Sequence, residues 1–139
     1  MKLLKMTMDH WNWLHRRCHP ILCADTIGIT AVDEKSNIMA VAAMDSWAPN
    51  SCQLHWAIDN PMVLRHGFIE ELCEFVFNTR DRGMIIGLVP ATNEKAIKLN
   101  KHIGMEEIGR VAGGYEIGCD LVIMQLHRDK CRWITEEAA

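Results

Sequence analysis

Residues 84–105 read MIIGLVPATNEKAIKLNKHIGM, a stretch that sets a strand and a helix in direct succession. Met84–Val89 is a continuous apolar run without alternation, which predicts a central strand buried on both faces. Apolar side chains then recur at helical spacing: Ala96, Ile97, Leu99 and Ile103. Thr92 or Asn93 is predicted to cap the start of this helix, and Gly104 to end it. The stretch therefore indicates a sheet with helical connections, as in an α/β or α+β domain.

A second strand-to-helix junction precedes this one. Cys52–Ile58 is predicted to be a strand, and Asp59-Asn60-Pro61 breaks it. From Met62 to Phe77 the apolar residues recur with the period of an amphipathic helix, which residues 80–83 close. Crevices outside the carboxyl ends of sheet strands are favoured ligand sites. The two junctions are therefore the first candidates for a ligand site.

The first third of the chain predicts one helix and one hairpin. The helix has Asp9 as its N-cap and ends at Cys18, because a proline follows two residues later. Residues 26–32 and 38–44 are β-rich and flank a polar turn, which predicts a hairpin. Residues 45–50 are expected to form a loop.

The last third predicts a second hairpin. Residues 106–111 and 120–127 read as strands, and Gly113-Gly114 is expected to form the turn between them. Because both hairpins and helical crossovers link neighbouring strands, the sheet is predicted to be mixed. With no repeat or linker in the sequence, we expect one domain over residues 1–139.

Composition restricts the classes of function. The 139 residues are 49% hydrophobic and 24% charged, which is typical of a globular domain and rules out intrinsic disorder. The formal net charge of −3 provides no basic field to hold nucleic acid or an anionic membrane. The sequence has no run of ~18 apolar residues, and its N-terminal segment lacks the apolar length of a signal peptide. We therefore expect a soluble protein of the cytoplasm, without nucleic-acid or membrane partners.

The cysteines and histidines do not predict a metal site. None of the six cysteines forms a CxxC pair, so we expect reduced thiols, most of them buried. His15, Cys18, His19 and Cys23 form a cluster near a proline, but their spacing is not that of a zinc site. No metal is therefore expected.

Two short motifs at the junctions suit an anion or an amide. Leu64-Arg65-His66-Gly67-Phe68 lies where the predicted helix begins, so main-chain N–H groups point outward with the positive end of the helix dipole behind them. Gly67 permits close approach of a phosphate, and Arg65 and His66 add donors. The alternative is that Gly67 only fits the entry turn. Asn93 either hydrogen bonds an amide-bearing ligand or only caps its helix.

The order of these elements, together with the series Asn-x-x-Ala-x-x-Leu-x-x-x-x-Gly-Met at residues 93–105, resembles the GNAT superfamily of acyl-CoA N-acyltransferases. The matching residues are Asn93, Ala96, Leu99, Ile103 and Gly104. The resemblance covers residues 25–130. The compact length and the end of the chain are similar, more faintly, to short GNAT-like proteins of tailed phages. The fold implied is a mixed, mostly antiparallel sheet with a central splayed pair of parallel strands and helices on both faces.

The resemblance implies an N-acetyltransferase. Such an enzyme moves an acetyl group from acetyl-CoA to a primary amine of a small molecule or protein, by direct attack in a ternary complex. The pantetheine arm would pair with the main chain at Ala57, Ile58 and Asp59. The pyrophosphate would meet the amides of the loop before the helix, at Leu64, Arg65, His66, Gly67 and Phe68.

Direct attack needs a base, because a free alkylamine is almost wholly protonated at pH 7. His55, on the strand that borders the implied cleft, is one candidate, since histidine ordinarily titrates in the right range. Asp59 is the other, although a carboxylate needs burial to act near neutral pH. For His55 the alternative is a packed strand residue, and for Asp59 a turn former.

Three positions depart from the family pattern. Of the pyrophosphate signature, here Leu64–Ile69, only the central Gly67 is retained, and Ile69 is expected to narrow the groove. Asn100 stands where the family often has a tyrosine that protonates the departing thiolate, and an amide cannot act as that acid. Tyr115, the only tyrosine, lies in the Gly-rich turn, away from that helix.

These departures support a second hypothesis, a GNAT-fold protein without catalysis. Its role would be structural, for example as a component of a phage particle whose partners are other virion proteins. A phage-encoded protein of either kind would be found in the host cytoplasm. The tail around Trp133 is expected to dock on a partner, such as a second copy in a homo-oligomer, or to fold back on the chain.

Overall fold

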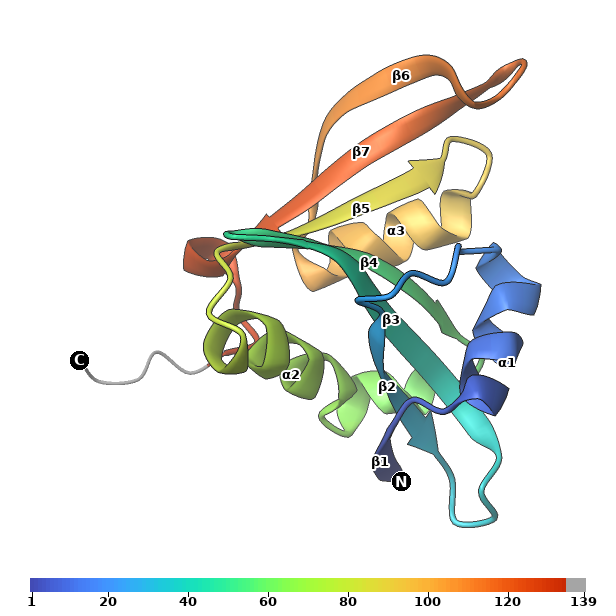
Figure 1. The fold of residues 1–139 in the computed structure, drawn as a ribbon, viewed down its shortest axis with the longest axis vertical. Helices are drawn as coiled ribbons and strands as arrows, with labels where there is room; N and C mark the ends of the chain where they lie inside the picture. Colours follow the sequence, from blue (N-terminus) through green and yellow to red (C-terminus); the bar gives the residue numbers. More distant parts are fainter. Residues whose placement is uncertain (135–139) are drawn as a thin grey trace.

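The computed structural model describes residues 1–134, which form a seven-stranded sheet in the order β1-β2-β3-β4-β5-β7-β6 (Figure 1). The strands are β1 Lys2–Lys5, β2 Ile27–Val32, β3 Ile38–Ala48, β4 Ser51–Ile58, β5 Met84–Pro90, β6 Glu106–Glu116 and β7 Cys119–His127. Strands β4 and β5 are parallel, and every other neighbouring pair is antiparallel. The mixed, mostly antiparallel sheet with a central parallel pair is therefore confirmed.

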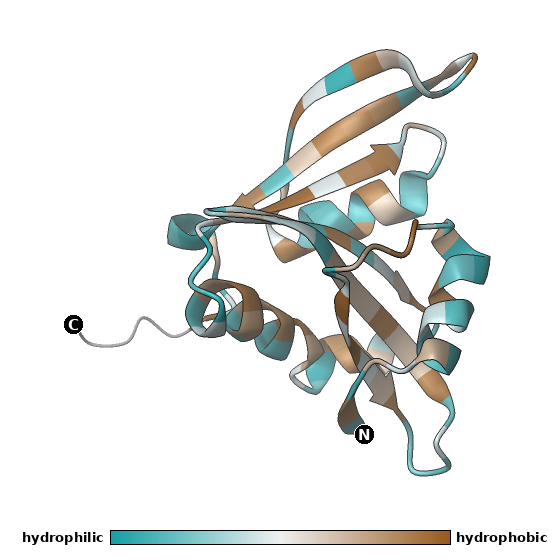
Figure 2. Ribbon diagram, in the orientation of Figure 1, coloured by the Kyte–Doolittle hydropathy of each residue, from teal (hydrophilic) through white to brown (hydrophobic). Residues whose placement is uncertain are grey.

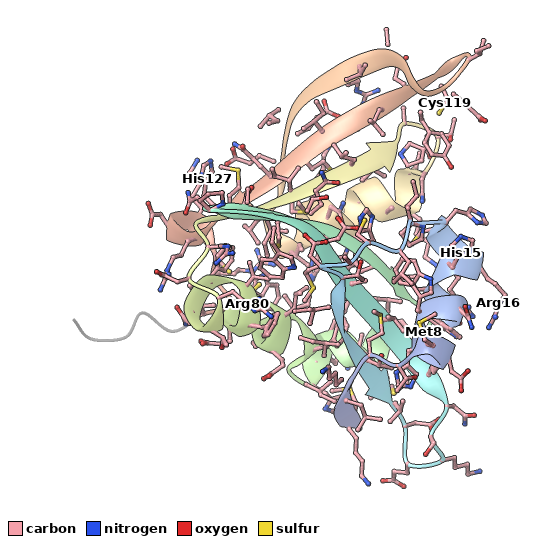
Figure 3. The ribbon with its side chains drawn as sticks, in the orientation of Figure 1. Met8, His15, Arg16, Arg80, Cys119 and His127 are labelled. Atoms are coloured by element: carbon pink, nitrogen blue, oxygen red, sulfur yellow. The ribbon has the colours of Figure 1, made fainter. Side chains whose placement is uncertain are left out.

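Helices cover both faces of the sheet, as expected. Helix α1 (Met8–Cys18) packs against Val41 and Ala43 of β3, and its labelled His15 and Arg16 point away from the sheet (Figures 1 and 3). Helices α2 (Phe68–Cys73) and α3 (Glu94–Ile103) belong to the other core cluster, which takes the alternate β3 residues. Successive side chains of a strand point to opposite faces of the sheet. Because β3 is a continuous apolar run, it presents apolar side chains to both faces (Figure 2). Within residues 1–134, no helix has the length and apolar character needed to cross a membrane.

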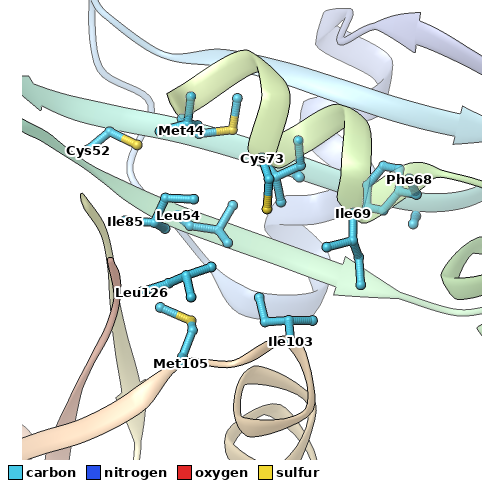
Figure 4. Packing of buried hydrophobic residues seen from close by; sticks show 14 of the residues in the cluster. Met44, Cys52, Leu54, Phe68, Ile69, Cys73, Ile85, Ile103, Met105 and Leu126 are labelled. Atoms are coloured by element: carbon cyan, nitrogen blue, oxygen red, sulfur yellow. The ribbon is translucent and has the colours of Figure 1, made fainter. Parts of the chain in front are cut away.

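The larger core cluster lies between the sheet and the two helices α2 and α3. Phe68 and Ile69 of α2 and Ile103 of α3 meet Met44 and Leu54 of the strands there, and all five side chains are buried (Figure 4). Truncating a buried aromatic or leucine side chain in such a core costs about 3–5 kcal/mol. The junctions before α2 and α3 are therefore held by well-packed helices.

Helix α1 begins two residues earlier than predicted. Its N-cap is Thr7, whose Oγ1 accepts a hydrogen bond from the His10 N–H at 3.4 Å. The Thr7 N–H donates in return to His10 Nδ1 at 3.0 Å, which completes a capping box. Asp9, the predicted cap, lies in the first turn, where its carboxylate complements the helix dipole.

The predicted helix over residues 62–77 is three shorter helices. A 3₁₀ helix, η1, spans Pro61–Arg65 and is capped by Asn60, whose side chain accepts from the Met62 N–H. Gly67 then adopts φ +87°, a left-handed conformation that interrupts the helix before α2. After α2 the chain continues as a π-helical segment, η2, over Glu74–Thr79. The apolar periodicity is kept through α2 and η2, because both segments turn their apolar residues to the same core.

The predicted loop over residues 45–50 and the predicted turn at Gly113-Gly114 both differ from the structure. Strand β3 does not end at Met44 but continues to Ala48, so Asp45 lies within the strand and not in a loop. Strand β6 runs to Glu116, and the turn falls at Ile117-Gly118, where Gly118 has φ +82°. The predicted Gly113-Gly114 turn is instead an irregularity within β6.

Strand β5 is not buried on both faces as predicted. Ile85 and Val89 are buried, whereas the Leu88 side chain between them is 39% exposed. Leu88 is exposed because β5 has no neighbour on its β4 side at this point.

The segment after β7 folds back on the chain as far as Trp133. A short 3₁₀ helix, η3 (Arg128–Lys130), follows β7, and Trp133 Nε1 then donates a hydrogen bond to the Ile103 carbonyl at 2.7 Å. Trp133 therefore folds back on its own chain, one of the two outcomes expected for it.

The cysteines carry free thiols, all six within the described residues. Cys52, Cys73 and Cys119 are buried, Cys131 is half-buried, and Cys18 and Cys23 are exposed. The exposed pair flanks the loop between α1 and β2.

Candidate active site

The two parallel strands in the middle of the sheet separate. Both lie wholly within the described residues, and they pair at Ser51↔Met84, Cys52↔Ile85 and Gln53↔Ile86. Beyond these positions β4 stays on β3 as far as Ile58, while β5 follows β7 as far as Pro90 (Figure 1). The sheet is therefore open between the carboxyl-terminal halves of β4 and β5.

The ladder between β3 and β4 determines which main-chain groups face the opening. The Asp59 N–H donates to the Met39 carbonyl at 2.9 Å. Hydrogen bonding alternates along an antiparallel ladder, so Ala57, opposite Val41, also directs its N–H to β3. Trp56 and Ile58 direct theirs the other way, into the opening. Of the three positions expected to pair with a pantetheine arm, Ile58 directs its N–H into the opening, whereas Ala57 and Asp59 direct theirs to β3; Trp56, which also faces the opening, was not among the expected positions.

A cavity of about 440 Å³ lies at the opening. His55 and Asp45 line it from the sheet face that α1 covers, whereas Trp56 and Asn100 line it from the face of α2 and α3. The loop after α1, strand β5 and strand β6 complete the walls with Ile21, Leu88 and Tyr115. The cavity therefore draws residues from both sides of the sheet, and its volume suits a small molecule.

His55 and Asp45 form a hydrogen-bonded pair in the cavity wall. His55 Nε2 lies 2.9 Å from Asp45 Oδ2, and Asp45 is only 3% exposed. An ionised carboxylate only accepts hydrogen bonds, so Nε2 is the donor in this contact, and in the neutral ring Nδ1 then carries the lone pair. The pair joins neighbouring strands diagonally, since Asp45 is opposite Gln53 and His55 is opposite Ala43. This arrangement can take up a proton from a ligand in the cavity.

Asp59, the other predicted base, lies in a different environment. Its two carboxylate oxygens accept hydrogen bonds from Arg17 at 3.0 and 2.7 Å, and its side chain is 49% exposed. The hydrogen bonds from Arg17 lower the pKa of Asp59. A lowered pKa and an ion pair at the surface weaken a carboxylate as a base. The residue is also outside the set that lines the cavity.

The junction before α2 leaves open space at Gly67. An atom added at the Cβ position of Gly67 meets nothing within 4 Å, and no side chain in the described structure caps the first turn of α2. The first N–H groups of a helix have no partner within it. Arg65 and His66 are exposed beside them, while Phe68 and Ile69 are buried in the core. The expected narrowing of the groove by Ile69 is therefore wrong, because its side chain points inward. Leu64 is half-buried against the same core.

Asn93 and Asn100, both on α3, also line the cavity. Asn93 is the N-cap of α3, and its side chain accepts a hydrogen bond from the Ala96 N–H at 3.1 Å. Asn100 is buried, and its Oδ1 accepts from Trp56 Nε1 at 2.9 Å across the opening. Asn93 thus caps its helix beside the cavity, and Asn100 ties α3 to β4.

Sequence reasoning missed Asp45, Trp56 and Tyr115 as parts of one cavity. Asp45 was assigned to a loop because a polar residue that follows a seven-residue apolar run ordinarily ends the strand, whereas β3 continues through it to Ala48. Tyr115 was expected to lie in a turn, away from the helix that carries Asn100. The turn position within β6–β7, which brings Tyr115 to the cavity, has no signal in the local sequence.

Comparison with known proteins gives the fold a family context. No protein-family model and no curated protein matches the sequence. Among solved structures, the spermidine/spermine N-acetyltransferase SpeG from Vibrio cholerae, in complex with manganese ions, aligns with a TM-score of 0.74 at 13% identity, over 93% of each chain. A mutant of that spermidine N-acetyltransferase aligns at 0.74 and 15% identity, over 94% of this chain and 96% of the other. The same enzyme in complex with CoA and spermine aligns at 0.64 and 19% identity, over 90% of this chain and 78% of the other. The chain therefore has the fold of the GNAT N-acetyltransferases.

Proposed function

We propose that this protein is an N-acetyltransferase that moves an acetyl group from acetyl-CoA to a primary amine. The observation that carries the proposal is the separation of β4 and β5 around a cavity that contains the His55–Asp45 pair. A structural neighbour solved with CoA and spermine supports the choice of coenzyme and of an amine acceptor.

The residues along the opening fit acetyl-CoA. The N–H groups of Trp56 and Ile58 suit the amides of an extended pantetheine arm, since they face the gap that a neighbouring strand would otherwise fill. The open space at Gly67 and the uncapped start of α2 suit a diphosphate, with Arg65 and His66 as additional donors. Bound acetyl-CoA would supply an acetyl group activated as a thioester.

His55 is the proposed base. Its Nδ1 takes a proton from the attacking amine, while Asp45 holds the ring through Nε2 and compensates the positive charge that forms. The neutral amine nitrogen then forms its bond to the acetyl carbon by direct attack, the carbon–sulfur bond breaks with its electron pair on sulfur, and the nitrogen loses its second proton to solvent. Asp45 acts through His55 and is a positioning residue.

The departing thiolate needs a proton from another group. Asn100 has no acidic proton to give, and its Oδ1 is engaged by Trp56 Nε1. Tyr115 lines the same cavity and is half-exposed, so its hydroxyl is the proposed donor.

Acetyl-CoA binding tests this function directly. We expect acetyl-CoA at a hundredfold its dissociation constant to raise the unfolding free energy by ~2.7 kcal/mol, as seen in thermal denaturation. The variant Arg65→Ala is expected to weaken binding. Arg16→Ala, on the outer side of α1 (Figure 3), is the matched control and is expected to leave it unchanged. No thermal shift at millimolar acetyl-CoA would instead favour the non-catalytic, structural role.

A further inference from the structure

We infer that the acceptor is a monoamine with an apolar body and not a polyamine, an inference that rests on the proposed function. Two properties of the cavity carry it: the charges of its lining side chains and the apolar side chains exposed at its mouth. The structural neighbours named above are spermidine or spermine acetyltransferases, so the inference separates this chain from them in substrate class.

The cavity offers one negative charge. Among the described residues that line it, Asp45 is the single carboxylate. Asp45 is already engaged by His55 at 2.9 Å, and the Cys23 thiol lies 4.0 Å from the same oxygen. The other ionisable lining groups are histidines, cysteines and a tyrosine: His19, His55, Cys18, Cys23 and Tyr115. A second ammonium group on the acceptor would therefore lose water without gaining a counter-charge.

Three apolar side chains are exposed at the cavity, beside the exposed polar residues His19, Ser46 and Asn93 that also line it. Ile21 is 80% exposed, Tyr115 is 48% exposed and Leu88 is exposed as described above, and all three line the cavity. They come from three separate elements, namely the loop after α1, strand β6 and strand β5. Exposed apolar side chains that converge on a concave site are typical of a binding site for an apolar ligand. An alkyl or aromatic group next to the reacting amine would cover them.

A matched pair of amines tests the charge argument. Hexylamine and 1,6-diaminohexane have the same carbon chain and differ by the second amino group. We expect hexylamine to have a kcat/KM at least about tenfold above that of the diamine, and 2-phenylethylamine to exceed spermidine by a similar factor. Calorimetric binding of the amines to the full chain without coenzyme is expected to give the same order. Equal or better binding and turnover of the diamine or spermidine would overturn the inference.

A pair of variants tests the position of the mouth. Ile21→Glu adds a carboxylate at the cavity. We expect this variant to lower the ratio of the kcat/KM for hexylamine to that for the diamine. Leu22→Glu adds the same charge one residue further, at an exposed side chain outside the cavity lining, and is expected to leave the preference unchanged. An equal effect of both variants would contradict the assigned position.

These outcomes separate the inference from the proposed function. Acetylation of spermidine in preference to monoamines leaves an acetyltransferase with a different acceptor. If no amine is acetylated and acetyl-CoA does not bind, the proposed function is wrong. The order in which the amines bind then tests the class of ligand by itself.

Discussion

His55 Nε2 and Asp45 Oδ2 lie 2.9 Å apart across β3 and β4, on the wall of the cavity that opens between β4 and β5. The pair exists because β3 continues past its apolar run and carries Asp45 into the sheet. A nearly buried carboxylate fixes the ring of a half-buried histidine, so the histidine is oriented before any ligand arrives.

His55→Ala is expected to lower kcat by about 10²–10⁴-fold, the usual contribution of a positioned base. Steady-state kinetics with a monoamine, together with the dissociation constant of acetyl-CoA, checks this; the latter is expected to stay unchanged. Gln53→Ala is the control, because Gln53 lies two residues earlier on the same strand and also lines the cavity. Full activity of His55→Ala would remove this residue from the mechanism.

Asp59→Asn is expected to reduce stability in a pH-dependent way. Because the hydrogen bonds from Arg17 lower the pKa of Asp59, the ion pair stabilises the folded state above the ordinary pKa of 3.8. This contribution is lost as the pH falls through the lowered value. For a half-exposed pair we expect the variant to cost about 0.5 kcal/mol at pH 6 and less at pH 3.

Urea unfolding of both proteins at the two pH values measures the difference. Glu34→Gln, at an exposed carboxylate of the β2–β3 turn, is expected to show no such dependence. If Asp59→Asn lowers the free energy of unfolding by the same amount at both pH values, then Arg17 does not lower the pKa of the Asp59 carboxylate.

Asn100→Ala is expected to destabilise the fold by about 1–3 kcal/mol, because it leaves the Trp56 Nε1–H without its acceptor in a largely buried site. Trp56→Phe in the Asn100→Ala background removes the unpaired donor and is expected to cost less than in the native background. A double-mutant cycle by urea unfolding measures this coupling. Additive costs would show that the hydrogen bond contributes nothing to the tie between α3 and β4.

Cys131 is expected to react with iodoacetamide at a lower pH than Cys23. A hydrogen bond from Cys73 is the main cause that lowers the pKa of Cys131, from 9.0 to about 7, whereas desolvation and nearby carboxylates raise that of Cys23. Mass spectrometry of the alkylated peptides against pH gives both midpoints. Cys73→Ala removes the donor and is expected to raise the midpoint of Cys131; an unchanged midpoint would exclude this cause.

The architecture followed from residues 84–105 and the junction before them, because apolar runs and helical periodicity are local signals. Strand β5 and helix α3, with Asn93 as cap and Gly104 at its end, are where the sequence predicted them. The parting of the parallel strands followed from the family resemblance, since no local pattern shows where two strands stop pairing.

The details of the site depended on contacts between distant segments. The register of β4 against β3 decides which residue, Ala57 or Ile58, directs its N–H into the opening. A register different by one residue would reverse the choice, and the amino-acid sequence alone does not set it. Asp59 pairs with Arg17, 42 residues away, and no local pattern shows this contact or the lowered pKa of Asp59 that it causes. Ile69 was expected to narrow the groove because it stands at a small-residue position of the family's pyrophosphate signature, but its side chain is buried in the core.

The central claim is that the separated strands leave main-chain donors for the coenzyme at Trp56 and Ile58. Hydrogen exchange of individual amides, measured by NMR with and without saturating acetyl-CoA, tests it most directly. The amides of Trp56 and Ile58 are predicted to exchange readily in the free protein and to become protected on binding, while those of Ala57 and Asp59 are protected in both states. Exchange at Trp56 and Ile58 that acetyl-CoA leaves unchanged would contradict the account.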